Sequence, residues 1–353
     1  MQHVWRGDGG AGLTEGVTGP IVDIHTHILP TEIPDFRADF GYGDFVTIEH
    51  EPHTSVMLQG GEFFRRVDRR LFDLEARLED CEQYGVDVQV LSTVPVMFSY
   101  WAKAEHGAAV ARFLNDDIAT SIAAHPGRFV GLGTVPLQDA DLAVDELTRC
   151  MGELSLAGIE IGTHCGTTNL NSPDLFPIFE AAADLGAAVF VHPWDMMAME
   201  DMPEFWLPWL VGMPAESARA ICSMLLGGVF ERLPALRVAF AHGGGSFPGT
   251  FGRIQHGYEV RPDLVATDTS LSPREQLGSF WVDSIVHDRR ALEYLVELLG
   301  PERVCLGTDF PFPLGELDPG ALIRETTKDG QARDRLLSRN ALDWLGGPET
   351  ADV

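Results

Sequence analysis

The sequence has almost no lysine. Of its 25 basic residues only Lys103 and Lys328 are lysines, and both lie in polar segments that we expect to be exposed. An enzyme that works through a Schiff base or through pyridoxal phosphate needs a lysine amine in a sheltered site. The sequence therefore argues against any chemistry that depends on a lysine adduct.

Positive charge is scarce as well. The chain has 25 basic and 53 acidic residues, which give a formal net charge of −28. A field of this sign repels nucleic acid phosphates and anionic membrane surfaces, so we expect neither as a partner. If the substrate is a small anion, local arginines must bind it, because the overall field does not attract it.

The chain also lacks paired cysteines and long apolar runs. There is no C-x-x-C motif, which favours free thiols in a reducing, cytoplasmic compartment over a disulfide framework. No apolar run approaches the roughly 18 residues of a membrane span, and the N-terminus does not have the basic and apolar stretches of a signal peptide. The five scattered cysteines are Cys81, Cys150, Cys165, Cys222 and Cys305.

What the sequence does have is a regular alternation of predicted strands and helices. Short apolar, β-branched runs are separated by amphipathic stretches, and this alternation is typical of βα units around a parallel sheet. The number of runs equals the number of strands in an α/β (β/α)₈ TIM barrel. The predicted strands are residues 21–24, 86–91, 129–135, 158–161, 188–191, 238–241, 280–283 and 304–306. The predicted helices include residues 71–84, 108–124, 142–151, 175–185, 215–226 and 289–299.

Two long connections interrupt this alternation. Residues 31–64 follow the first predicted strand and residues 196–213 follow the fifth, and both are expected above the catalytic mouth of the barrel. We therefore predict a single barrel domain over residues 20–346 with a small insertion, 31–64, after strand 1. The remaining residues, 1–19 and 347–353, are predicted to be flexible tails.

Five ionisable side chains stand where predicted strands end. His25 and His27 follow the first strand, His192 the fifth, His242 the sixth and Asp309 the eighth. A barrel brings the C-terminal ends of all its strands to one face, so ligands that are remote in sequence can meet on one ion. Three imidazoles and a carboxylate, from His25, His27, His192 and Asp309, suit Zn²⁺ and leave one position for water. We predict one zinc ion per subunit.

His242 precedes three glycines and is predicted to be a general acid/base. Zinc lowers the pKa of a bound water toward about 7, and a neighbouring imidazole can take and return that proton. The alternative is a histidine that is hydrogen-bonded within the barrel rim. His164, at the end of the fourth predicted strand, is a further candidate, and the sequence leaves open whether it supports the metal ligands. The histidines not predicted as site residues are His3, His50, His53, His106, His125, His256 and His287.

Several ordered blocks of sequence carry a resemblance to a known family. They include VDIHTHILP, VLSTVPVMFSYWAKAE, FVHPWDMM, LPWLVGMPAES, AHGGGSFPGTFGRI and LGTDFPFPLGELDPG, and they lie between residues 20 and 346. On these blocks the chain resembles the aminocarboxymuconate-semialdehyde decarboxylases of the amidohydrolase superfamily. The resemblance implies a zinc-dependent carbon-carbon lyase that converts 2-amino-3-carboxymuconate-6-semialdehyde to CO₂ and 2-aminomuconate semialdehyde. It implies tryptophan degradation by the kynurenine pathway, and the sequence leaves a biosynthetic pathway open.

The site residues of that family fall on matching positions of this chain. The resemblance implies the same four zinc ligands, with His242 and Asp309 as catalytic residues, and substrate arginines at Arg65 and Arg253. It implies a homodimer in which Arg253 is donated across the interface. Arginine forks match the two carboxylates of such an anionic substrate. The other substrate-binding residues implied are Phe64, Trp194, Met196, Trp209 and Phe312. Without the resemblance, a surface ion pair is the better explanation for each arginine, and core packing is the better explanation for Trp209 and Phe312.

The resemblance also implies a mechanism. An activated water adds to the conjugated double bond, a proton reaches the adjacent carbon, and the tetrahedral centre expels CO₂ while His242 and Asp309 move protons. Many members of the superfamily use two metals bridged by a carbamylated lysine on strand four. No lysine stands between residues 158 and 164, so we predict a single metal.

One departure from the family leaves the exact substrate open. Gln59 and Glu62 stand at positions where family members carry lysines, and Arg66 is a candidate to compensate for the missing charge. The alternative function is a metal-dependent hydrolase or hydratase of the same superfamily that acts on a related carboxylated substrate. A noncatalytic metal-binding protein has no need for His242 or Arg253.

Overall fold

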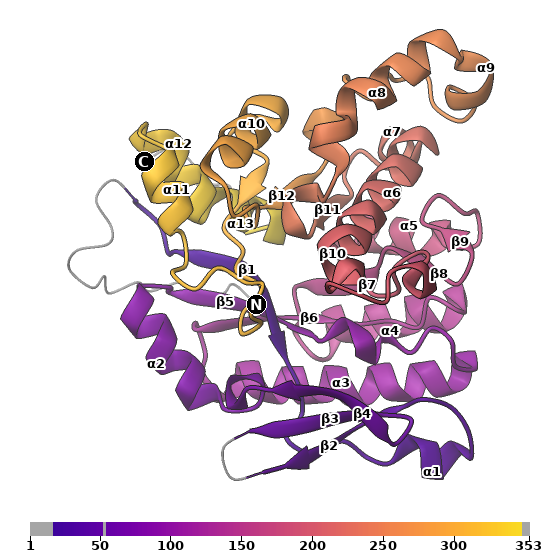
Figure 1. The fold of residues 1–353 in the computed structure, drawn as a ribbon, viewed down its shortest axis with the longest axis vertical. Coiled ribbons are helices and arrows are strands. Elements are labelled where there is room, and N and C mark those ends of the chain that lie inside the picture. The colour runs from indigo at the N-terminus through magenta and orange to yellow at the C-terminus, as the bar shows by residue number, and fades with distance from the viewer. Residues whose placement is uncertain (1–16, 52–53, 348–353) are drawn as a thin grey trace.

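The centre of the molecule is an eight-stranded parallel sheet (Figure 1). The structure is a computed structural model that describes residues 17–51 and 54–347. The strand order is β1-β5-β6-β7-β10-β11-β12-β13. The strands are β1 (Val22–Ile28), β5 (Val88–Thr93), β6 (Phe129–Gly133), β7 (Gly158–Gly162), β10 (Ala188–His192), β11 (Arg237–Phe240), β12 (Trp281–Asp283) and β13 (Val304–Cys305). Each of the eight predicted runs overlaps one of these strands.

Backbone hydrogen bonds connect the first strand to the segment that follows the last. The amide of Ile24 donates to the carbonyl of Leu306 at 2.9 Å, and the amide of His27 donates to the carbonyl of Phe310 at 2.8 Å. The amide of Asp309 donates to the carbonyl of His25 at 2.8 Å. The sheet therefore curls round on itself, which confirms the predicted (β/α)₈ barrel.

Helix α13 (Asn340–Leu345) closes the bottom of the barrel. Its Trp344 is fully buried in the same apolar cluster as Ile24 and Phe190, and the rings of Trp344 and Phe190 lie 6.0 Å apart. The barrel interior is thus filled by side chains from below, and only the mouth at the C-terminal ends of the strands is left for a site.

Amphipathic helices surround the sheet and confirm the predicted ones. They are α2 (Leu74–Tyr84), α3 (Ala104–Ala124), α4 (Ala140–Gly152), α5 (Phe176–Leu185), α6 (Met213–Leu226) and α10 (Arg289–Leu299). Three of them begin with an aspartate whose side chain accepts a hydrogen bond from a backbone amide in the first turn: Asp73, Asp139 and Asp288. The other helices are α7 (Val229–Arg232), α8 (Phe247–Val260), α9 (Pro262–Val265), α11 (Ala321–Thr326) and α12 (Gly330–Asp334).

The connection after β1 forms a small subdomain, which lies below the barrel in Figure 1. Helix α1 (Phe36–Phe40) leads into an antiparallel sheet of β2 (Val46–His50), β3 (Ser55–Gln59) and β4 (Glu62–Val67). The turn between β3 and β4 consists of Gly60 and Gly61, whose φ angles of 61° and 88° suit glycine. The ring of Phe45 packs 4.7 Å from that of Trp101. The predicted insertion, 31–64, is therefore folded, and its last strand runs on to Val67.

The predicted tails lie largely outside the described residues, since 1–16 and 348–353 are not described. Within the described part, the Thr18 amide donates to Asp334 Oδ1 at 2.6 Å, and the Gly347 amide donates to the Leu342 carbonyl at 2.9 Å. No helix in the described ranges combines the length and the hydropathy needed to cross a lipid bilayer.

Candidate metal centre and active site

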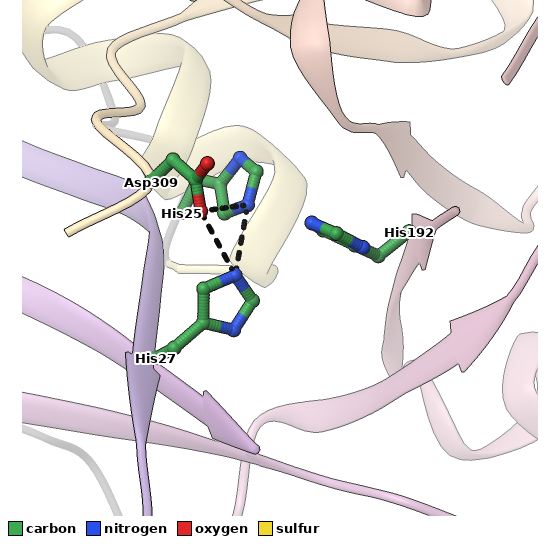
Figure 2. A group of neighbouring side chains, drawn as sticks. All are labelled: His25, His27, His192 and Asp309. Carbon is green, nitrogen blue, oxygen red and sulfur yellow. Dashed lines mark hydrogen bonds and ion pairs between the residues drawn. The ribbon is translucent and has the colours of Figure 1, made fainter. Parts of the chain in front are cut away.

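The four predicted metal ligands meet at the mouth of the barrel. His25 and His27 belong to β1, His192 ends β10, and Asp309 follows β13. Figure 2 shows their side chains around a common centre, and one ligand atom of each lies within 4.8 Å of all the others. His25 Nε2 and His27 Nε2 are 3.2 Å apart, and Asp309 Oδ1 lies 3.6 Å from the first and 3.2 Å from the second. All four residues are buried.

The imidazoles are held in the orientation that a metal requires. In each ring Nδ1 has a polar partner, which leaves Nε2 free to face the centre. The partners of Nδ1 are Asp283 Oδ2 for His25 at 2.7 Å, the Thr93 carbonyl for His27 at 2.9 Å and the Pro193 carbonyl for His192 at 2.7 Å. The buried Nε2 of His192 has no hydrogen-bond partner among the described residues. A divalent cation would satisfy this nitrogen, so the residues present fit a metal.

The protonation states of His25, His192 and Asp309 also suit a cation. Burial lowers the pKa of His25 and holds the pKa of His192 well below its usual range. Burial acts to raise the pKa of Asp309, but His242 and His27 outweigh it and hold that pKa well below its usual range. Neutral imidazoles and an ionised carboxylate are the forms that bind Zn²⁺ or a similar ion.

His242 lies beside this cluster. Its ring centroid is 4.9 Å from that of His192, and its Nε2 is 3.8 Å from Asp309 Oδ2, an ion-pair distance and not a hydrogen bond. Burial works against a protonated ring, but the Asp309 carboxylate outweighs it and raises the pKa of His242. The site thus has one imidazole outside the ligand set that can hold a proton.

The glycines after His242 fit the backbone that the site requires. The φ angles of Gly243, Gly244 and Gly245 are 60°, 75° and 61°. A Cβ on Gly245 would lie 2.3 Å from the Pro214 carbonyl oxygen, which excludes any larger residue. The turn therefore brings α6 against the strand end that carries His242.

A cavity of about 480 Å³ opens above the cluster. His242 and Asp309 line it together with six of the seven predicted substrate-binding residues, Phe64, Arg65, Trp194, Met196, Trp209 and Phe312. The guanidinium carbon of Arg65 lies 4.6 Å from the ring centroid of Phe312, a cation–π contact. Burial lowers the pKa of Arg65, which Asp309 opposes. The structure therefore brings one arginine and several aromatic residues to the metal ligands.

Arg253 is the exception. It lies on α8, is exposed, and does not line the cavity of its own chain. Figure 1 shows α8 and α9 extending away from the barrel. A single copy of the chain thus leaves this arginine outside the site.

The hairpin residues Gln59, Glu62 and Arg66 do not line the cavity either. Gln59 and Glu62 pair with each other beside the turn of the β3–β4 hairpin. Successive residues of a strand point to opposite faces, and Arg65 faces the cavity, so Arg66 points away from it. There Arg66 pairs with Glu51 at 2.6 Å. Arg66 therefore does not line the cavity of its own chain, and its role as a compensating charge stays a prediction.

His164 supports the loop after β10. Its Nδ1 lies 2.8 Å from the Gly166 carbonyl and its Nε2 lies 2.9 Å from the Asp195 carbonyl. Its own carbonyl accepts a hydrogen bond from Trp194 Nε1 at 3.0 Å. His164 thus fixes a segment of the cavity wall and is not part of the ligand cluster.

Two buried acids at the site are not among the predicted site residues. Asp283, the last residue of β12, ends a predicted strand, and an acid at the C-terminal end of a barrel strand is itself a signal of a site residue. Glu160 lies within β7 with Oε1 3.9 Å from His27 Nδ1, and burial holds its pKa well above the usual range. Glu160 thus stands in the fourth strand of the barrel, the strand on which two-metal members of the superfamily carry the carbamylated lysine.

Known proteins resemble this chain over nearly its whole length. The profile of the amidohydrolase family matches residues 22–347. The 2-amino-3-carboxymuconate-6-semialdehyde decarboxylase of Dictyostelium discoideum is 52% identical over 327 residues, which cover 92% of this chain and 91% of that protein.

Two solved structures share the fold. The apo IDCase of Metarhizium anisopliae has a TM-score of 0.80 and 22% identity, and the match covers 94% of this chain and 98% of that one. The dihydroxybenzoic acid decarboxylase of Polaromonas sp. JS666, solved with bound manganese and 2-nitroresorcinol, has a TM-score of 0.73 and 20% identity, with coverage of 93% and 97%. These comparisons confirm the resemblance seen in the sequence and the prediction of a metal-dependent carboxy-lyase. The chain therefore belongs to the amidohydrolase family, among its metal-dependent decarboxylases.

Proposed function

We propose that this protein is a zinc-dependent, nonoxidative decarboxylase of 2-amino-3-carboxymuconate-6-semialdehyde. The observation that carries the proposal is the cavity itself, in which a three-histidine, one-aspartate cluster, a separate imidazole and a half-buried arginine face the same space. The relative with 52% identity is named for this substrate. The setting we propose is tryptophan degradation in the cytoplasm, where the five free cysteines would stay reduced.

Zinc is the metal we propose for the cluster of His25, His27, His192 and Asp309. Three imidazoles with one carboxylate are a donor set that zinc favours in catalytic sites. When bound, the ion would lower the pKa of a water toward about 7 and so supply a nucleophile at neutral pH. The Polaromonas decarboxylase holds manganese, so elemental analysis of the purified protein distinguishes the two metals.

The residues of the cavity then have separate tasks. Arg65 binds a substrate carboxylate through its fork of N–H groups and is held against Phe312. His242 takes the proton of the water whose oxygen adds to the double bond, and returns it to the adjacent carbon that carries the departing carboxylate. Asp309 Oδ2, 3.8 Å from His242 Nε2, stabilises the protonated imidazole between these two events. When the bond to CO₂ breaks, its electron pair re-forms the double bond and expels the added hydroxide, so that no water is consumed. The apolar wall excludes bulk water while CO₂ leaves.

We propose in addition a homodimer in which Arg253 of one subunit completes the site of the other. The exposed position of Arg253 on α8 supports this, as do large apolar side chains near the cavity mouth that a partner would cover. These side chains are Phe205, Trp206, Leu210 and Val211, which are 79%, 41%, 50% and 54% exposed.

Mixing two inactive variants tests the dimer. A mixed dimer of His242→Ala and Arg253→Ala subunits has one site with both residues, so random reassociation should restore about a quarter of wild-type turnover. No recovery in demonstrably mixed dimers would contradict donation across the interface.

The proposed reaction is tested with freshly generated aminocarboxymuconate semialdehyde and zinc-loaded protein. The expected result is a loss of substrate absorbance with one CO₂ released per molecule consumed. A hydrolase or hydratase would consume the substrate without CO₂, and that outcome would overturn the proposal.

A further inference from the structure

Asp283 connects two parts of the site that are remote in sequence. It is the last residue of β12 and is fully buried. Its Oδ2 lies 2.7 Å from His25 Nδ1 and accepts a hydrogen bond from the His242 amide at 2.8 Å. Its Oδ1 accepts hydrogen bonds from the amides of Gly243 at 2.7 Å and Ile285 at 3.0 Å. One carboxylate therefore contacts a metal ligand and the backbone of the acid/base residue.

Polar contacts hold both oxygens of the Asp283 carboxylate. A buried carboxylate whose oxygens meet four polar partners has little freedom to move. The polar partners of its two oxygens thus fix the position of the Asp283 carboxylate.

The backbone at His242 needs such a partner. His242 has a φ of 57° and Gly243 a φ of 60°, two left-handed residues in succession, of which only the second is a glycine. A non-glycine residue in this region is strained, and the surrounding contacts must hold it there. The consecutive amides of His242 and Gly243 both point to Asp283. These bonds are the contacts that keep the imidazole of His242 directed at the cavity.

We propose that Asp283 is a positioning residue that fixes the metal ligand His25 and the acid/base His242 relative to each other. It orients the first through the imidazole and the second through the main chain. The part that concerns His242 rests on the proposed function, whereas the part that concerns His25 does not.

Asp283→Asn tests this with little change of shape. An amide has one oxygen, so in either orientation its NH₂ group faces N–H donors that the carboxylate accepted. Loss of a partner behind a ligating histidine typically lowers metal affinity by about 10–100-fold. Chelator competition should show a loss of this size. The d–d spectrum of the cobalt-substituted protein should change as well, because it reports the geometry of the ligands.

Turnover at saturating metal then tests the link to His242. The expected result is a lower kcat for Asp283→Asn than for wild type when both are fully loaded. In the His242→Ala background, the same substitution should cause no further loss, because the residue through which Asp283 acts is gone. The control is Asp334→Asn, another buried carboxylate that accepts a backbone amide, which ends helix α12 and is not part of the metal cluster. It should leave metal affinity unchanged.

Three results would overturn the proposal. They are unchanged metal affinity in Asp283→Asn, full recovery of kcat by excess metal, and an equal loss of kcat with and without His242. If the variant does not fold, hydrogen exchange on the wild type decides, since the amides of His242 and Gly243 should exchange as slowly as core amides. Exchange at the rate of an open loop would refute the role. A protein that releases no CO₂ refutes only the proposed function, because the chelator and exchange measurements do not depend on turnover.

Discussion

The metal cluster and the segments that cover it are built differently. The ligands at the strand ends are at most 8% exposed, and each histidine ring is tied by Nδ1 to a neighbour. The covering segments are the insertion up to Val67, the loop after β10 and the first turn of helix α8, where Pro248 and Gly249 line the cavity. These carry Phe63 and Phe205, which are 64% and 79% exposed.

The residues proposed for catalysis and the residues proposed for substrate selectivity therefore lie on different parts of the fold. Groups that hold a cation and move protons need fixed positions, and closed strands provide them. The groups that we propose bind the substrate lie on segments outside the barrel, since Arg65 comes from β4 and Trp209 from the connection after β10. Changes at the strand ends should therefore reduce turnover, and changes in the covering segments should mainly alter affinity.

Removal of the metal should have the largest effect. Chelated protein should lose turnover completely and recover it when zinc is added, because the ligands are preformed and the water is not activated without the ion. His192→Ala should lose turnover as well, without recovery at stoichiometric zinc. Elemental analysis alongside the CO₂ assay checks both, and turnover in fully chelated protein would contradict the mechanism.

His242 should come next. Replacing it by Ala or Asn should lower kcat by roughly 10²–10⁴-fold, the usual contribution of a general acid/base. The metal content should stay at the wild-type level because His242 is outside the ligand set. Loss of metal together with activity would instead place His242 among the structural supports of the cluster.

Of the two regions, the metal cluster at the strand ends is the one that the sequence predicts best. Strand ends of a barrel share one face, so His25, His192 and Asp309 could be placed together without knowledge of any contact. The same reasoning places Asp283, which ends the predicted strand 280–283, at this face, but it does not identify His25, 258 residues away, as its partner. The covering segments were harder still, since glycines at 249, 252 and 257 weaken the helical signal of α8.

Arg65 tests the covering segments. Muconate and sorbate share a six-carbon diene and differ by one carboxylate, so they report carboxylate recognition without turnover. Arg65→Lys should weaken muconate binding to the zinc-loaded protein by about 10-fold, because a lysine cannot form the bidentate pair. Arg66→Ala is the matched control, since Arg66 binds Glu51 and faces away from the cavity. Calorimetry in which both variants weaken equally would refute the assignment of Arg65.

The smallest effect is expected at Glu316 and concerns the stability of the segment that follows the metal ligand Asp309. The segment after Asp309 faces the catalytic cavity through Phe312 and a second cavity of about 190 Å³ through Glu316. Burial raises the pKa of Glu316 from 4.5 to about 7. Between these values the folded protein binds more protons than the unfolded chain, so the free energy of unfolding falls as pH rises toward 7.

Glu316→Gln removes this titration. Its side-chain oxygen can still accept the Leu322 amide, which Glu316 accepts at 3.2 Å. The variant should equal or fall below wild type in stability at pH 5 and exceed it by about 1 kcal/mol or more at pH 8. The ionised Glu316 also raises the pKa of Asp23, so its removal acts in the same direction there. Denaturant unfolding at the two pH values measures the difference, and an identical difference at both would show that Glu316 is already ionised in the folded protein. Turnover should not change, because Glu316 does not line the catalytic cavity.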